Sequence, residues 1–137
     1  MPRTVRLPRL GRMTEIVAEF QVTRWDAEPY AEQDTVLSQV VVEKTFTGAV
    51  SGTSTARVLT AQAEGGQGYV ASERFEGTID GRSGTLVYQH GGIMDGEDGT
   101  TFGTIVPGSG TGELAGLRGT ITLWHDAQGA TITLRLS

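Results

Sequence analysis

The sequence predicts an all-β domain: an up-and-down antiparallel barrel of about eight strands, with little or no helix. Segments rich in Thr, Val and Ile, which favour strands, recur at short intervals and are separated by glycine-containing turns. No long window shows the apolar stripe of a helix, although Ala27–Gln33 could form one helical turn. Evenly spaced short strands of this kind are typical of barrels and sandwiches, and we expect the barrel.

The pattern divides the chain into eight strand-like segments. In chain order they are Thr14–Trp25, Val36–Thr47, Thr53–Ala63, Tyr69–Thr78, Thr85–Gly91, Thr100–Val106, Thr120–Asp126 and Thr131–Leu136. The glycine-rich stretch Pro107–Gly119 precedes the seventh segment directly. A tight glycine corner that leads into a strand is a way to bend a sheet until it closes.

Composition limits the function classes. The chain has 137 residues, 20 of them Gly, no Cys, and a formal net charge of −5. Without cysteine there is no disulfide, thiolate nucleophile or Cys-type zinc site, which fits a cytoplasmic protein. No apolar run approaches the roughly 20 residues of a membrane-spanning helix, so we expect no membrane partner. The acidic body is a poor partner for nucleic acid phosphates.

The first residues differ from the rest. Residues 1–12 contain four arginines and no acidic residue, and they lack the apolar region of a secretory signal. We interpret them as a basic leader outside the fold. The single barrel domain then covers residues 13–137.

An internal repeat predicts a buried ion pair. The pattern Phe-x-Gly-x-Val/Ile-x-Gly occurs at Phe46–Gly52 and again at Phe75–Gly81. The same offset relates Lys44 to Glu73, the only charged members of two otherwise apolar strand faces. If neighbouring strands are antiparallel, these two segments are parallel and one strand apart, about 9–10 Å. We therefore expect both side chains to point into the barrel and to be coupled, directly or through water.

The second strand-like segment is apolar on both faces, with Val40, Val41 and Val42 in succession. Strands that are buried on both faces typically have such continuous apolar runs. Since no helix is available to cover the outer face, the pattern predicts self-association through that wall.

Two kinds of acid–base chemistry are open. His90 shares the inward face of its strand, so it could form a general acid–base pair with Glu73, although a histidine at a strand end is more often simply hydrogen-bonded. Paired carboxylates drawn from Glu43, Glu73, Asp80 and Glu113 would instead indicate an acid peptidase. Neither histidine has the additional ligands that a metal site needs, and we expect no metal and no cofactor.

Two stretches carry a family resemblance: Tyr69–His90 and the glycine corner Pro107–Gly119. From about Met13 to its C-terminus the chain resembles the bacterial proteins grouped as domain of unknown function 3224 (DUF3224). The glycine corner is also similar to that of allene oxide cyclases and dirigent proteins. The resemblance implies an eight-stranded antiparallel barrel that encloses a cavity and often self-associates. By family motif it marks Glu73, Arg82, His90, Ser109 and Glu113 as ligand-binding or catalytic positions. The last strand, Ala130–Leu136, departs from the family because it lacks the His and Tyr that relatives often have there.

The leading functional hypothesis is binding of a small, largely apolar molecule in the lumen, with cyclase- or isomerase-like chemistry as an extension. In this hypothesis Tyr69, Phe75 and Tyr88 supply apolar walls, and Lys44, Glu73 and His90 orient polar groups. A hydrolase with paired carboxylates and a structural module without catalysis are the alternatives. An open cavity favours the first, two neighbouring carboxyl groups the second, and a filled lumen the third.

Overall fold

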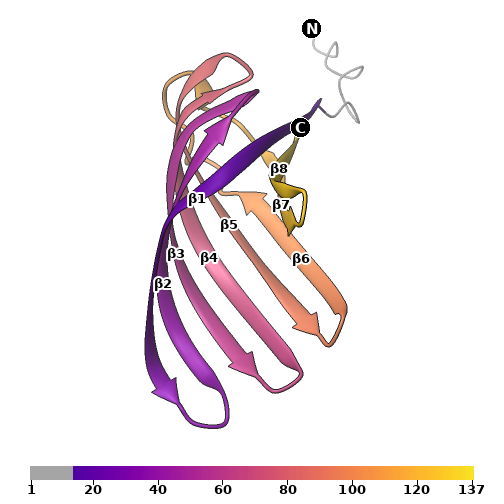
Figure 1. Ribbon diagram of the computed structural model, residues 1–137. Helices are drawn as coiled ribbons and strands as arrows, with labels where there is room; N and C mark the ends of the chain where they lie inside the picture. The colour runs from indigo at the N-terminus through magenta and orange to yellow at the C-terminus, as the bar shows by residue number, and fades with distance from the viewer. Residues whose placement is uncertain (1–13) are drawn as a thin grey trace, which may run out of the picture.

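Eight antiparallel strands form one closed hydrogen-bonded ring in which each strand lies beside its sequence neighbours (Figure 1). The computed structural model describes residues 14–137. The strands are β1 (Thr14–Glu32), β2 (Val36–Thr47), β3 (Val50–Ala63), β4 (Gly66–Ile79), β5 (Arg82–Asp95), β6 (Asp98–Ile105), β7 (Gly119–Asp126) and β8 (Gly129–Leu136). A 3-10 turn at Gly112–Leu114 lies between β6 and β7. The predicted fold class is confirmed, and the basic leader lies outside the described residues.

Strand β1 differs most from its prediction. The predicted strand ends too early at Trp25, because residues 26–32 pair with the start of β2 and continue the strand, so that the helical turn open to Ala27–Gln33 does not form. A register shift between Val22 and Arg24 inserts Thr23 as an extra residue. Such a bulge reverses the alternation of inward and outward side chains. As a result Val22 and Trp25, three residues apart, both line the interior.

The interior of the ring has two halves. One half is packed with apolar side chains, among them Phe46, Phe75, Ile79 and Leu86, each about 1% exposed. The other half is lined by smaller side chains of β2, β3 and β4 and encloses a cavity. The packed half supplies the hydrophobic stabilisation, since a fully buried aliphatic or aromatic side chain contributes about 1.5–3 kcal/mol.

The glycine corner between β6 and β7 closes the packed end. It buries Leu114 and Leu117 in the core and is tied to β5 by the hydrogen bond from the Thr111 amide to the Thr85 carbonyl oxygen, 2.9 Å. A Cβ on Gly84 would overlap the carbonyl oxygen of Thr111, and one on Gly110 would overlap that of Leu114. Glycine is required here because backbone packs directly on backbone.

The ring is closed over only part of its height. Strand β8 pairs with β1 from Thr14 to Phe20, and β6 pairs with β7 at the single position Thr104–Thr120. Strands β1 to β6 extend well beyond the short β7–β8 hairpin (Figure 1). Among residues 14–137 the far part of β1 and the start of β6 therefore have a neighbouring strand on one side only, and they flank the open half.

The outer wall of β2 is partly covered. Val40 and Val42 face inward and are buried, whereas Val41 faces outward and is half-buried. Self-association through this wall stays a prediction. Over residues 14–137 the structure contains no helix that is long and apolar enough to cross a membrane.

The narrow β6–β7 seam generates a stability prediction. A Cβ on Gly103 would overlap the carbonyl oxygen of Ile121 in β7, so we expect Gly103→Ala to lower the free energy of unfolding by about 1–3 kcal/mol through overpacking. Gly66→Ala is the matched control, since the nearest atom to its Cβ is the Met94 carbonyl oxygen at 3.3 Å. Urea unfolding followed by tryptophan fluorescence measures both. Equal stability of the two variants would contradict close contact at this seam.

Candidate functional site

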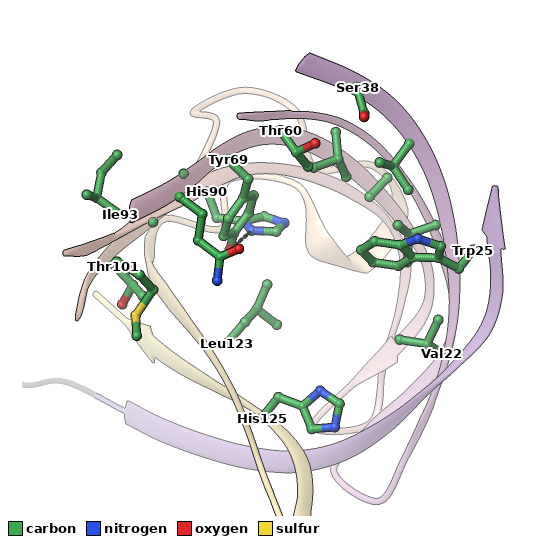
Figure 2. A pocket seen from close by; sticks show the side chains of 18 of the residues that line it. Val22, Trp25, Ser38, Thr60, Tyr69, His90, Ile93, Thr101, Leu123 and His125 are labelled. Carbon is green, nitrogen blue, oxygen red and sulfur yellow. Dashed lines mark hydrogen bonds between the residues drawn. The ribbon is translucent and has the colours of Figure 1, made fainter. Parts of the chain in front are cut away.

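A cavity of about 720 Å³ occupies the open half of the ring. Its walls come from β1 to β7 and combine apolar side chains with polar ones that are distributed over β2 to β7. In a view into the cavity, Tyr69 and His90 lie together on one wall, and Leu123 and His125 project from β7 on another (Figure 2). Trp25 and Val22 stand on the β1 side (Figure 2). The space is an open, largely apolar pocket rather than a side-chain-filled core.

A buried carboxylate lies where the cavity meets the packed half. Glu73 is 1% exposed, and both its oxygens accept hydrogen bonds. Lys44 Nζ (3.0 Å) and His90 Nε2 (2.8 Å) contact Oε1. Ser54 Oγ (2.5 Å) and Tyr88 OH (2.8 Å) donate to Oε2. A carboxylate with four hydrogen-bond partners is fully satisfied, so its burial is tolerated.

Strand alternation and register place these groups together. Lys44 is opposite Ser54 in the β2–β3 pair, and Glu73 is opposite Tyr88 in the β4–β5 pair. His90 follows Tyr88 by two residues and therefore points to the same side. The ion pair between Lys44 and Glu73 confirms the coupling predicted from the sequence repeat.

The balance of forces on Glu73 favours its ionised form. Burial alone would raise the pKa of the carboxyl. The hydrogen bonds from His90 and Ser54 and the positive charge of Lys44 outweigh burial and lower the pKa to about 2. Glu73 is therefore a carboxylate throughout the physiological pH range, and it acts as a fixed negative charge rather than as a general acid.

A second hydrogen bond extends the cluster toward the cavity. Tyr69 OH lies 2.9 Å from His90 Nδ1, so Tyr69, His90 and Glu73 form a continuous chain. Burial, with a contribution from the charge of Glu73, raises the pKa of Tyr69, and its hydroxyl stays protonated. The same two causes, burial first, raise the pKa of Tyr88 well above its usual value.

The cluster presents only part of itself to the cavity. Lys44, Tyr69 and His90 line the cavity, whereas Glu73 and its two hydroxyl donors lie behind them. Lys44 Nζ also lies 4.9 Å from the ring centre of Phe20, a cation–π distance. The floor of the cavity is thus built from hydrogen-bond donors backed by a buried negative charge.

Five of the predicted ligand-binding residues lie elsewhere. Phe75 and Tyr88 are buried in the packed half and do not line the cavity, which corrects the expectation that they form its walls. Alternation predicts that a side chain faces inward but not how far along the barrel it lies. Arg82 is exposed at the start of β5. Ser109 bonds the backbone of Val87, and Glu113 accepts from the Ser83 amide, so both hold the glycine corner. These three are remote from the cavity.

The carboxylates predicted as candidates for pairing do not meet. Glu43 points outward and bonds Arg24 at 3.0 Å, Glu113 is at the glycine corner, and Asp80 occupies a turn with φ +51°. Within residues 14–137 no second carboxylate contacts Glu73, and no three His, Asp or Glu side chains are grouped as metal ligands. The described residues therefore lack the shared-proton pair of an acid peptidase.

Several residues of the cluster and the cavity escaped sequence analysis. Ser54, which donates to Glu73 behind the cavity wall, carries no charge and has no signal that sets it apart from other strand residues, although the alternation of Ser54, Ala56 and Val58 marks an inward face. Trp25 is brought inward by the bulge in β1. His125 and Leu123 share a face that the sequence does indicate as inward, but nothing in the pattern shows that they lie opposite Tyr69.

The lowered pKa of Glu73 generates a prediction about acid stability. A carboxyl whose pKa falls from 4.5 to about 2 on folding contributes stability that is complete above pH 4.5 and is lost as the pH falls toward 2. The contribution is on the order of 3 kcal/mol. We expect the double variant Lys44→Met/Glu73→Gln, which leaves no unpaired charge, to lose less stability over this range than the wild type.

Urea unfolding at a series of pH values measures this difference. Glu15→Gln is the control, because Glu15 forms an exposed ion pair with Arg135 and should leave the acid limb almost unchanged. An identical acid limb in the double variant and the wild type would contradict the assignment to Glu73.

Comparison with known proteins places the chain in a family. Residues 16–136 match the family model described as "Protein of unknown function (DUF3224)". A crystal structure of a DUF3224 protein of unknown function from Shewanella oneidensis MR-1 superposes with a TM-score of 0.85 at 30% sequence identity, covering 92% of this chain and 97% of that one. Comparison with curated proteins yields no match. The match over nearly the whole barrel and the shared fold together show that the chain belongs to the DUF3224 family.

Proposed function

We propose that this protein binds a small, largely apolar molecule in the barrel lumen, with one polar group of the ligand against the floor. The observation that supports this most directly is the cavity itself. It is open, its volume of about 720 Å³ is typical of small-molecule sites, and three of its polar groups, Lys44, Tyr69 and His90, are held together beside the buried Glu73.

The walls fit an apolar ligand body. Val40, Val42, Ala56 and Val58 form a continuous inner surface across β2 and β3, and Leu123 lies across from the Tyr69 wall. Small and β-branched side chains leave the space free while keeping it apolar. Burying ligand surface against them contributes about 25 cal/mol per Å².

The floor supports a finer proposal, acid–base steering of the bound molecule. Tyr69 presents a hydroxyl to the cavity and is backed by His90, which is in turn held by Glu73. A hydroxyl, an imidazole and an orienting carboxylate in sequence form the arrangement by which enzymes move a proton at a fixed point. Cyclase- or isomerase-like chemistry on the ligand would use this chain.

The alternatives receive less support. A hydrolase with paired carboxylates needs a second carboxylate near Glu73, and the described residues provide none. A structural module without a ligand would be expected to fill its lumen, and here half of the lumen is open. Ligand binding is therefore the function that the geometry favours.

Blocking the cavity tests the proposal. Thr60 of β3 lines the cavity beside Tyr69, and Leu59 faces the opposite side of the same strand and is 50% exposed. We expect wild-type protein to bind the neutral dye N-phenyl-1-naphthylamine with increased fluorescence. Thr60→Trp should weaken that binding at least about tenfold by occupying the space, and Leu59→Trp should leave it unchanged.

Native mass spectrometry of protein purified without denaturation is the companion measurement, because it detects a retained molecule directly. Circular dichroism and thermal unfolding confirm that both tryptophan variants are folded. If the dye binds both variants and the wild type equally, it does not occupy the lumen, and the proposal is wrong.

A further inference from the structure

The hydrogen-bond chain at the cavity floor has two internally consistent states that differ by one proton. Glu73 is ionised and can only accept, so the hydrogen in its contact with His90 belongs to Nε2. When His90 is neutral, its Nδ1 therefore carries no hydrogen and accepts from the Tyr69 hydroxyl. The hydroxyl hydrogen then points at His90, away from the cavity.

Protonation of His90 reverses the outer link. An imidazolium donates from both nitrogens, so Nδ1–H would bond the oxygen of Tyr69 and release the hydroxyl hydrogen toward the cavity. The distance of 2.9 Å between Tyr69 OH and His90 Nδ1 fits either direction. One proton on His90 thus changes the cavity-facing group of Tyr69 from an acceptor into a donor.

Charge balance distinguishes the two states. Lys44 and Glu73 form a neutral ion pair, and both are more than nine-tenths buried. With a neutral His90 the cluster has no net charge, whereas a protonated His90 gives it a net charge of +1 that an anionic ligand would balance. Within residues 14–137 the other titratable groups around His90 are Tyr69, Tyr88 with ring centres 5.8 Å apart, and His125 on the facing wall, and none of them supplies a second negative charge.

We propose that the ligand carries a single carboxylate on its apolar body, and that binding places this group between Lys44 and Tyr69 while His90 takes up one proton. The inference rests on the proposed function and names its ligand class. The negative charge of the ligand balances the imidazolium, and the carboxylate receives hydrogen bonds from the Lys44 ammonium and the Tyr69 hydroxyl. Lys44 has two further N–H groups beyond the one directed at Glu73, so it can serve both carboxylates.

The experiment compares three probes with the same eight-carbon chain: octanoate, octanol and octylamine. Isothermal titration calorimetry is run between pH 6 and 8, where octanoate stays ionised. We expect octanoate to bind more tightly than octanol, and octylammonium to bind least. The octanoate Kd should rise by up to about tenfold per pH unit as the pH increases, because binding of octanoate requires the uptake of one proton. The octanol Kd should show no pH dependence.

Proton uptake is measured directly by repeating the titration in phosphate and in Tris, whose ionisation enthalpies differ. We expect close to one proton taken up per octanoate bound, and none per octanol. His90→Asn should remove both the uptake and the pH dependence.

A second variant keeps the test independent of the folding of His90→Asn. Tyr69→Phe removes only the hydroxyl, and it should reduce the preference for octanoate over octanol by about 10- to 100-fold, the value of a hydrogen bond to a charged group. Tyr30→Phe is the matched control, since Tyr30 is an exposed tyrosine of β1 outside the cavity.

The outcomes separate the two proposals. Equal binding of octanoate and octanol, without proton uptake, would overturn the carboxylate assignment and leave apolar binding in place. If none of the three probes binds while N-phenyl-1-naphthylamine still does, the carboxylate assignment is wrong and the proposed function stands; if the dye does not bind either, both proposals are wrong.

Discussion

The ionised carboxylate of Glu73 is the constraint on which much of this barrel depends. Its four partners come from β2, β3 and β5, so one buried charge connects four consecutive strands. A slip of one residue in any of these pairings would turn Lys44 or Glu73 to the outer face and leave the other charge buried alone. Removing one partner of such a pair costs about 3–5 kcal/mol, which penalises every alternative register.

The same cluster lies between a packed half of the barrel, which gives stability, and an open half, which contains the cavity. On one side Phe46 and Phe75 pack edge to face with ring centres 5.6 Å apart, and the glycine corner covers the end. On the other side the long strands remain paired with one another, but no side chains of the described residues fill the space along their inner surface. The fold tolerates an unfilled cavity because the packed half stabilises the whole ring, and because the open half is built on extensions of the same strands.

Some features of this structure could be predicted from the sequence and others could not, depending on whether a local pattern or a repeat encodes them. Strand number and topology were predictable, since turn residues and alternation are local signals. The contact between Lys44 and Glu73 was also predictable, because a repeat gives register between segments that are distant in the chain. Depth along the barrel was not: Phe75 and Tyr69 alternate inward in the same strand, yet one lies in the packed half and the other on the cavity wall.

The extent of β1 shows a further limit. The strand was predicted to end at Trp25, but pairing with β2 continues it to Glu32, and Pro29 is tolerated there because this part of β1 lies at the edge of the sheet. The bulge at Thr23 then changes which residues face inward, and no residue there signals it in advance. Trp25 therefore reaches the cavity through a tertiary effect rather than through its own alternation.

The direction of the Glu73 pKa shift bears on the kind of chemistry this floor can perform. A carboxyl acid catalyst needs a raised pKa, as in sites where apolar burial outweighs hydrogen bonding. In this barrel the hydrogen-bond donors and the charge of Lys44 outweigh the effect of burial on the pKa of Glu73. The carboxylate is therefore ionised, and it lies behind Lys44, Tyr69 and His90. Its effect on a bound molecule is consequently indirect: it holds the ammonium of Lys44 in place and fixes the ring of His90. In the proposed complex, the groups that would contact the ligand are a cation and a phenol hydroxyl, both suited to an oxygen that carries or develops negative charge.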